Sequence, residues 1–242
     1  TILISIMFAN NEIGTIQNVS QIGAIAHEHN VLFHTDAAQA VGHIPIDVKK
    51  MNIDLMSFSS HKIYGPKGIG ALYLRSLMPR VKLNSIVYGG GQERNIRSGT
   101  LNVPGIVGFA KAVEIAVSEM NDENKKYKKW TDSMLEKFAA VGGKLNGHPE
   151  NRLVHNLNIR FDGIEGKAII NSVSKKIAIS AGSACTTQNV EPSHVLLALG
   201  LSEEQSHYAI RIGCGRFNTD EDIGIATGEI LNALKSLNKI RI

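Results

Sequence analysis

The chain has 242 residues, of which 43% are hydrophobic and 20% are charged, with a formal net charge of +4. This length accommodates one large domain or two smaller ones, and this composition excludes a disordered or fibrous protein. Because a net charge this small is common among enzymes, direct nucleic-acid binding is not expected.

Membrane insertion and disulfide scaffolding are also not expected. No apolar stretch reaches the roughly 20 residues that cross a bilayer, and the first residues lack the basic region of a signal peptide. Two cysteines, Cys185 and Cys214, are too few for a disulfide framework. We therefore expect a soluble, cytoplasmic protein with no membrane partner. Because the chain opens on Thr1 and enters an apolar run at once, we expect it to be part of a longer protein.

Strand and helix signals alternate over the first hundred residues. Asn18, followed three residues later by Gln21, predicts a helix N-cap of the capping-box type. Apolar runs predict strands over residues 2–8, 31–36, 54–59 and 69–75, the first of them nearly continuous and buried. Strands that alternate with helices predict an α/β layer of parallel strands.

Around Pro104 the pattern becomes helical. Apolar residues at steps of three and four predict a long helix from there to a stop at Gly142 and Gly143, continuous or with one break. Alternation over residues 155–161 predicts a half-buried strand. The remaining predicted elements are a helix over 167–176, a strand over 177–180 and a closing helix capped by Thr219 and Asp222.

Lys62 stands just after the third predicted strand, among hydroxyl groups, a histidine and glycines. Loops at the carboxyl ends of parallel strands bind ligands in α/β folds, and a partly desolvated lysine there forms a Schiff base with an aldehyde cofactor. Ser59 and His61 could hydrogen-bond a phosphate that anchors such a cofactor. By itself this pattern also fits a plain surface lysine.

Asp36 ends another apolar strand, where an unpaired carboxylate is costly to bury. A pyridinium nitrogen would be a suitable partner, because the carboxylate keeps it protonated and the ring then acts as an electron sink. Gln39 and Asn11 could donate hydrogen bonds to the phenolic oxygen of the same ring. The alternative for Asp36 is a helix N-cap or a turn aspartate.

Four motifs together resemble the class V, fold-type-I pyridoxal-phosphate enzymes, of the cysteine desulfurase type. These are residues 10–14 (NNEIG), 34–39 (HTDAAQ), 59–68 (SSHKIYGPKG) and 89–94 (GGGQER). The resemblance covers essentially the whole chain, while the N-terminal third of a family member is absent from it. It implies that pyridoxal 5'-phosphate is bound by the following residues: Lys62 as the covalent attachment, Asp36 at the ring nitrogen, Asn11 and Gln39 at the ring, and Ser59 and His61 at the phosphate.

The resemblance also implies a fold and an assembly. The fold is α/β and like the pyridoxal-phosphate transferases: a partial large domain with a mainly parallel sheet (1–105), a connecting helix region (106–145) and a small C-terminal α+β domain (146–242). The assembly is a homodimer, in which the segment 97–100, with Thr100, reaches the phosphate of the neighbouring subunit.

Cys185 narrows the reaction. It stands in a run of small, loop-forming residues, 180–187 (SAGSACTT), which suits a mobile nucleophile. The run resembles the catalytic loop of IscS/NifS-type desulfurases, in which the cysteine attacks the sulfur of L-cysteine and becomes a persulfide while L-alanine is released. The alternative is a buried structural cysteine. No metal site is predicted.

Arg211 lies in a predicted alternating strand, where an inward-facing guanidinium pairs with a planar anion such as a substrate α-carboxylate. The resemblance gives this arginine that role, and it implies that Asn11 also contacts the substrate. For Arg216 a structural salt bridge fits the sequence at least as well as a contact with the substrate. Cys214 fits a small core residue within the strand.

Two other functions remain open. One is a class V aminotransferase or lyase that uses the same lysine without a thiol. The other is an inactive fragment or scaffold that binds no cofactor. The residues do not distinguish among sulfur acceptors, since an acceptor protein for iron–sulfur cluster assembly, tRNA thiolation or DNA phosphorothioation would each suit such an enzyme.

Overall fold

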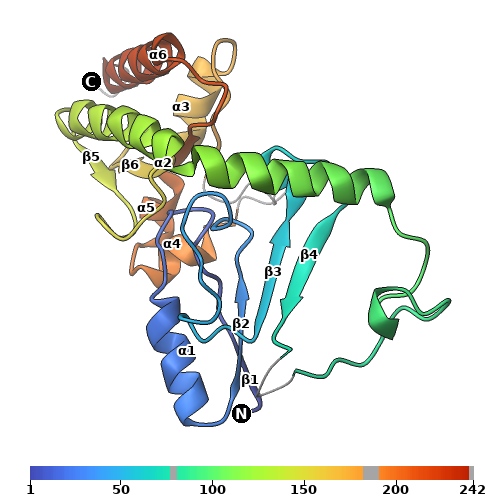
Figure 1. Cartoon of the computed structure of the whole chain (residues 1–242). Coiled ribbons are helices and arrows are strands. Elements are labelled where there is room, and N and C mark those ends of the chain that lie inside the picture. Colours follow the sequence, from blue (N-terminus) through green and yellow to red (C-terminus); the bar gives the residue numbers. More distant parts are fainter. Residues whose placement is uncertain (77–80, 182–190, 240–242) are drawn as a thin grey trace. The chain divides into compact units, whose positions relative to one another are not determined.

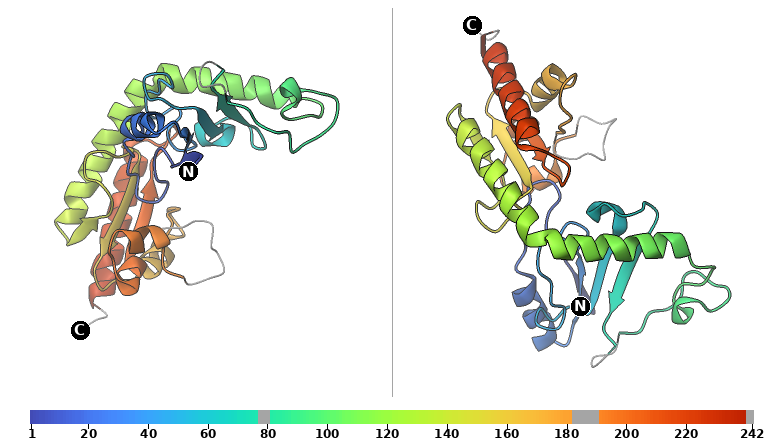
Figure 2. Two further views of the ribbon diagram at one scale, coloured as in Figure 1. Left: turned by 90° about the horizontal axis from the view of Figure 1, so that it is seen from below. Right: turned by 45° about the horizontal axis from the view of Figure 1, so that its top comes forward.

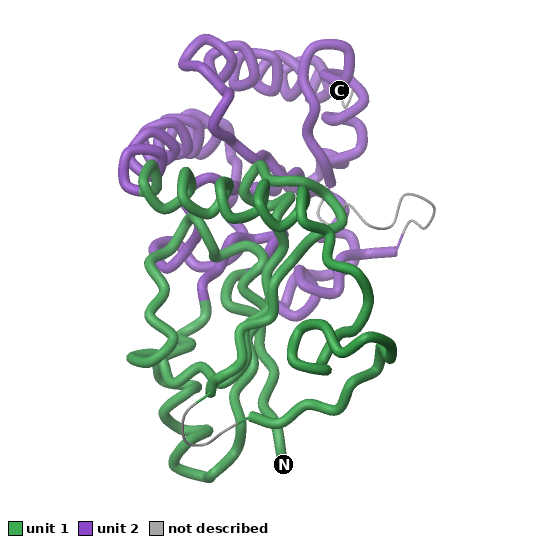
Figure 3. Tube along the Cα trace, turned by 45° about the vertical axis from the view of Figure 1, so that its right-hand side comes forward, with its two compact units in different colours: residues 1–9, 17–120 green, residues 10–16, 121–242 purple. Residues whose placement is uncertain are grey.

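A computed structural model describes residues 1–76, 81–181 and 191–239. It divides the chain into two compact units (Figure 3). Unit 1 comprises residues 1–9 and 17–120, and unit 2 comprises residues 10–16 and 121–242. The short segment 10–16, near the start of the chain, therefore packs with the C-terminal half.

Unit 1 is built on a four-stranded sheet in the order β1-β2-β3-β4 (Figure 1). The strands are β1 (Leu3–Ser5), β2 (Leu32–Asp36), β3 (Leu55–Ser59) and β4 (Gly70–Leu74). The first three are parallel, as predicted, but β4 runs antiparallel to β3. The prediction of parallel strands is wrong for β4 because the connection 60–69 is shorter than the dozen or so residues that a parallel crossover needs.

The first strand is shorter and more exposed than predicted. β1 is three residues long, and Ile2 and Leu3 are 89% and 44% exposed. Burial begins only at Phe8 and Ala9. The prediction of a buried strand over residues 2–8 is therefore wrong at its start, because β1 is an edge strand that pairs with β2 alone.

Helix α1 (Val19–Glu28) begins where the sequence predicts. The side chain of Asn18 accepts a hydrogen bond of 3.3 Å from the backbone N–H of Gln21. The capping box is incomplete, because the Gln21 side chain accepts from the Asn18 side chain rather than from its backbone N–H. Gly23 lies on the buried side of the helix, where a Cβ atom would stand 2.3 Å from the carbonyl oxygen of Met51. Only glycine permits this close approach.

Helix α2 (Val103–Ala139) is one uninterrupted helix, a continuous ribbon in Figure 2, with Pro104 in its first turn as predicted. Its first part packs Phe109, Ala112 and Ala116 against Ile63 in the core of unit 1. Its last part contributes to the core of unit 2, through Tyr127, Trp130, Met134 and Phe138. In the described part of the chain, no helix is long and apolar enough to span a membrane.

Unit 2 contains an antiparallel sheet in the order β5-β6-β7, with helices packed on it. The strands are β5 (Gly143–Leu145), β6 (Asn156–Phe161) and β7 (Ala209–Gly213). The helices are α3 (Gly166–Val173), α4 (His194–Ala198), α5 (Glu203–His207) and α6 (Asp220–Lys239). Thr219 and Asp222 form the predicted capping box of α6, because each side chain accepts a hydrogen bond from the other residue's backbone N–H, at 3.1 Å and 2.9 Å.

Three local predictions in unit 2 are wrong. β6 is not half-buried, because Asn156 and Asn158 on its second face are buried as well and donate hydrogen bonds to backbone carbonyls of the 10–16 segment. Residues 177–180 form no strand, and Ser180 makes only an isolated bridge to β7. Cys214 is buried as expected, but it follows the last residue of β7 rather than lying within the strand.

Candidate active site

The carboxyl ends of β2 and β3 bring four of the predicted residues into one region of unit 1. Asp36 ends β2 and Ser59 ends β3, and the sheet register pairs Asp36 with Ser57. A hydrogen bond of 2.8 Å from the Ala37 N–H to the Ser57 carbonyl continues this pairing past the end of β2. His61 and Lys62 follow directly in the short 3-10 helix η1 (Ser60–Ile63). Because β2 and β3 are parallel neighbours, these residues lie together at the carboxyl ends of the strands.

The side chain of Lys62 is available for chemistry. Lys62 and His61 are exposed, and neither makes a hydrogen bond or ion pair with the residues that the structure describes. Their backbone is nevertheless fixed, because Ile63 is buried against α2 and Tyr64 ends η1 with a left-handed φ of 65°. An exposed lysine on a fixed turn can bond a ligand without losing an existing partner.

Asp36 combines the two alternatives that its sequence context allows. One carboxylate oxygen, Oδ1, accepts a hydrogen bond of 2.9 Å from the N–H of Ala38, which is a turn contact. The other oxygen has no hydrogen-bond partner within the described ranges, and the residue is exposed. Gln39 follows in the same turn and is half-buried. The carboxylate therefore retains an acceptor for a cationic ligand.

Thr100 lies farther along unit 1, in an exposed segment that follows the 3-10 turn η2 (Glu93–Asn95). All three residues of η2 have left-handed backbone angles, with φ of 49°, 58° and 62°. Such a run is strained and requires support from its surroundings, part of which comes from the Gln92 side chain, which accepts from the Gly99 N–H at 2.8 Å. No hydrogen bond joins Thr100 to Lys62 across the residues with described positions.

Unit 2 brings together Asn11 and Arg211. The Arg211 guanidinium donates through Nε to the Ser180 hydroxyl (3.2 Å) and through Nη1 to the backbone carbonyl of Asn11 (3.1 Å). Arg211 is half-buried in the middle of β7, where it pairs with Asn158 of β6. Its Nη2 has no partner among the described residues, so one edge of a firmly held guanidinium stays available for a planar anion.

The two cysteines differ. Cys185 lies outside the described residues, as does most of the run 180–187. Cys214 is 7% exposed, and burial raises the pKa of its thiol to about 11. Its thiol therefore stays protonated at neutral pH. Arg216 makes the structural ion pair that the sequence left open, because its Nη2 lies 3.3 Å from Oε2 of Glu123 on α2.

Glu12 is a polar residue that the sequence reasoning passed over. Its side chain is only 3% exposed, and its Oε2 accepts a hydrogen bond of 2.6 Å from the hydroxyl of Ser193. Its place between Asn11 and Ile13 in the 10–14 motif was the only sequence signal, since an acidic residue inside an otherwise buried turn needs a partner.

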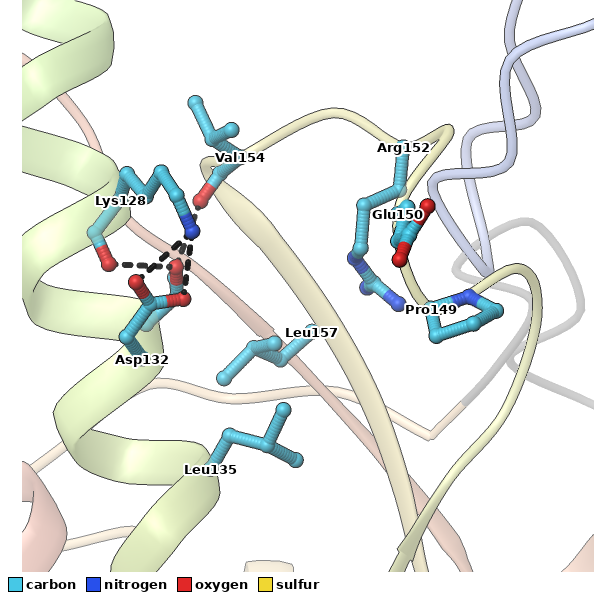
Figure 4. A pocket seen from close by; sticks show the side chains of 9 residues that line it. Lys128, Asp132, Leu135, Pro149, Glu150, Arg152, Val154 and Leu157 are labelled. Carbon is cyan, nitrogen blue, oxygen red and sulfur yellow. Dashed lines mark hydrogen bonds and ion pairs between the residues drawn. The ribbon is translucent and has the colours of Figure 1, made fainter.

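Two cavities lie away from most of these residues. A cavity of about 280 Å³ in unit 2 has Lys128 and Asp132, which form an ion pair, on its helix side and Arg152 on its loop side (Figure 4). None of the predicted site residues lines it. A cavity of about 960 Å³ in unit 1 lies between β4 and residues 93–102, and its lining includes Arg97 and Thr100 of the predicted segment 97–100.

The architecture of unit 1 defines a class of protein. Unit 1 has a mainly parallel sheet that presents a lysine, an aspartate, a serine and a histidine at adjacent strand ends. Its similarity to solved structures of NifS-like proteins identifies the fold as that of the fold-type-I pyridoxal-phosphate enzymes. The family model described as aminotransferase class-V matches residues 1–225. The chain belongs to this family.

Individual relatives narrow the similarity. The chain is 52% identical over 225 residues to a protein of Methanosarcina thermophila named cysteine desulfurase IscS, an alignment that covers 92% of the chain and 55% of the relative. A solved structure titled NifS-like protein is 38% identical, with a TM-score of 0.88, and covers 98% of this chain and 62% of the other. A structure titled SspA in complex with cysteine is 37% identical, with a TM-score of 0.71, and covers 90% and 60%. The chain spans between 52% and 59% of the length of eight curated relatives that it matches.

Proposed function

We propose that this chain is part of a cysteine desulfurase, which uses pyridoxal 5'-phosphate to convert L-cysteine to L-alanine and leaves the sulfur as a persulfide on Cys185. The observation that carries the proposal is the group at the ends of β2 and β3, where Lys62 and Asp36 each keep an unused polar group. The names of the relatives and the bound cysteine in the SspA structure support the substrate.

The polar side chains at these strand ends match the functional groups of the cofactor. Asp36 has a free carboxylate oxygen for a protonated ring nitrogen, and Gln39 follows it in the same turn for the ring oxygen. Ser59 and His61 supply a hydroxyl and an imidazole for a phosphate, and Lys62 supplies the amine for the aldehyde. When bound, the cofactor withdraws electrons from the α-carbon of the amino acid.

The residues of the chain would then perform three tasks. Arg211 binds the α-carboxylate of cysteine through the guanidinium edge that Ser180 and Asn11 leave free. Lys62 would hold the cofactor and, when its amine is free, would take and return the α-proton. Cys185, as a thiolate, is the nucleophile.

The sulfur transfer needs no external oxidant. The thiolate of Cys185 forms a sulfur–sulfur bond to the substrate's sulfur, and the bond between that sulfur and Cβ breaks with its electron pair left on carbon. The carbon side takes up a proton and leaves as alanine. One thiol and one molecule of cysteine thus become one persulfide and one molecule of alanine.

The assembly and the cellular role follow from the same proposal. We propose a homodimer in which Thr100 contributes to the phosphate site of the partner subunit. We also propose a cytoplasmic enzyme that gives its sulfur to an acceptor protein. Supply of sulfur for iron–sulfur clusters agrees with the bacterial relatives named cysteine desulfurase IscS.

Covalent capture of the cofactor tests the proposal. The chain is incubated with pyridoxal phosphate, reduced with borohydride and digested, and the modified peptide is identified by mass spectrometry. We expect the label on Lys62 and its loss in Lys62→Ala, whereas Lys67→Ala, which removes another exposed lysine of the same motif, should retain it. Labelling of a different lysine in the unmodified sequence, or none at all, would overturn the proposal.

A further inference from the structure

The turn at residues 10–14 is held rigidly in unit 2. The side-chain oxygen of Asn10 accepts hydrogen bonds from the N–H groups of Glu12 (2.8 Å) and Ile13 (3.0 Å). Asn158 on β6 donates to the Glu12 carbonyl at 3.2 Å, and Gly14 takes a left-handed φ of 76°. The turn is therefore a fixed point to which other segments of the unit can be attached.

The Glu12 side chain attaches α4 to this turn. Ser193 is the N-cap of α4, and its hydroxyl oxygen accepts from the Leu196 N–H at 3.3 Å while it donates to Glu12 Oε2 at 2.6 Å. The Ser193 hydroxyl has one proton. Because the Glu12 carboxylate accepts that proton, the lone pairs of the hydroxyl oxygen remain available to the Leu196 N–H. Ile13 and Leu196 pack in one apolar cluster beside this contact.

The backbone of the same turn attaches a second segment. Asn11 O accepts from Arg211, and Arg211 in turn holds the Ser180 hydroxyl. In the sequence, Ser180 and Ser193 stand on either side of Cys185. The turn thus connects to the chain both before and after the proposed nucleophile, once through Arg211 and once through Glu12.

We propose that Glu12 is a positioning residue for sulfur transfer, which acts by holding Ser193 and the start of α4, eight residues after Cys185 in the sequence. This inference rests on the proposed function. The Glu12 carboxylate takes no part in the Arg211 contacts, so cysteine binding and sulfur transfer depend on different arms of the turn. If the Glu12 carboxylate only stabilised the fold, its removal would impair cysteine binding and sulfur transfer to the same extent.

Steady-state kinetics of the 242-residue chain loaded with pyridoxal phosphate separate the Glu12–Ser193 contact from the Asn11–Arg211 contact. In Glu12→Ala and Ser193→Ala we expect kcat for alanine and for the Cys185 persulfide to fall about tenfold, because a hydrogen bond to a charged group contributes at least about 1.4 kcal/mol. KM for cysteine should not change. Arg211→Gln should instead raise KM. Glu12→Gln keeps an acceptor for the Ser193 hydroxyl and should restore most of kcat, and Glu150→Ala, an exposed acid of unit 2, is the matched control.

Amide hydrogen exchange adds a readout that needs neither cofactor nor turnover. The Leu196 amide should exchange faster in Glu12→Ala and Ser193→Ala, no faster in the double variant than in either single one, and at the original rate in Glu12→Gln. Unchanged exchange, or a parallel change in kcat and KM, would overturn the positioning role. Absence of the borohydride label on Lys62 would overturn the proposed function, whereas unchanged exchange of the Leu196 amide would overturn the positioning role of Glu12 alone.

Discussion

The reactivity of single side chains in this protein depends on how exposed their positions in the fold are. Lys62 and Asp36 keep free polar groups because strand ends present them outward, whereas the thiol of Cys214 is sealed in a core and made less acidic. Substitutions at this scale test chemistry rather than folding.

Replacing Cys185 with serine should stop sulfur transfer and leave cofactor binding intact. A hydroxyl at neutral pH is not a thiolate and cannot accept sulfur. We expect cysteine still to alter the absorbance of the loaded chain, but alanine release to fall to background. Cys214→Ser should turn over like the unmodified protein, because the Cys214 thiol is buried and protonated. The reverse result for the two variants would assign the nucleophile to Cys214.

Replacing Asp36 with asparagine should weaken catalysis without loss of the fold. The amide oxygen can keep the turn contact with the Ala38 N–H but cannot neutralise a protonated ring nitrogen. Loss of a hydrogen bond to a charged group predicts a fall in kcat of about tenfold or more. The circular dichroism spectrum should not change. Unimpaired turnover would remove Asp36 from the mechanism.

At the scale of the elements, one buried aspartate joins three strands of unit 1. Asp54 precedes β3 and is 0% exposed. Its Oδ2 accepts from the Phe33 N–H in β2 at 2.8 Å and lies 2.9 Å from His27 Nε2 of α1, while Oδ1 lies 2.8 Å from Nε of Arg75, just past β4. A single carboxylate thus contacts α1, β2 and the end of β4 in the unit that carries the proposed cofactor site.

Removal of the cationic partner of Asp54 should destabilise unit 1 strongly. Arg75→Met keeps most of the aliphatic stem but leaves the buried carboxylate without its guanidinium, a change that typically costs about 3–5 kcal/mol. Urea denaturation monitored by far-ultraviolet circular dichroism should show the lower free energy of unfolding. Lys50→Met, at an exposed surface ion pair, should cost less than about 1 kcal/mol. Equal effects of the two substitutions would mean that Asp54 is not anchored by Arg75.

At the scale of the whole molecule, the buried thiol makes the unfolding free energy depend on pH in alkaline solution. Burial raises the pKa of Cys214 from 9.0 to about 11. As pH rises from 9.0 towards 11, the unfolded chain loses this proton before the folded chain does. The contribution to stability is therefore complete below the unfolded pKa and is lost as pH rises through the folded pKa.

This linkage can be measured by urea denaturation across that pH range. A pKa difference of this size corresponds to roughly 2–3 kcal/mol between the two ends of the range. We expect Cys214→Ala to be less stable than the unmodified chain near neutral pH and to show a smaller loss of stability on going from pH 9.0 to about 11. Parallel stability curves for the two proteins would show that the Cys214 thiol does not ionise differently in the folded state.

Local signals in the sequence determined most of the elements. The steps of three and four residues predicted α2, and the caps at Asn18 and Thr219 predicted the starts of α1 and α6. The apolar runs 31–36 and 54–59 placed Asp36, Ser59, His61 and Lys62 at or just after strand ends, where the structure has them, while their chemical roles stay predictions. These inferences succeed because periodicity, capping and strand-end position depend on residues close together in the chain.

Only the tertiary structure decided the features that depend on distant residues. β6 is buried on both faces because the 10–16 segment covers its asparagine side chains. Arg211 binds the backbone of Asn11 rather than its side chain, and Glu12 finds its partner in Ser193. No local pattern encodes these contacts, because each hydrogen bond joins residues that lie far apart in the sequence.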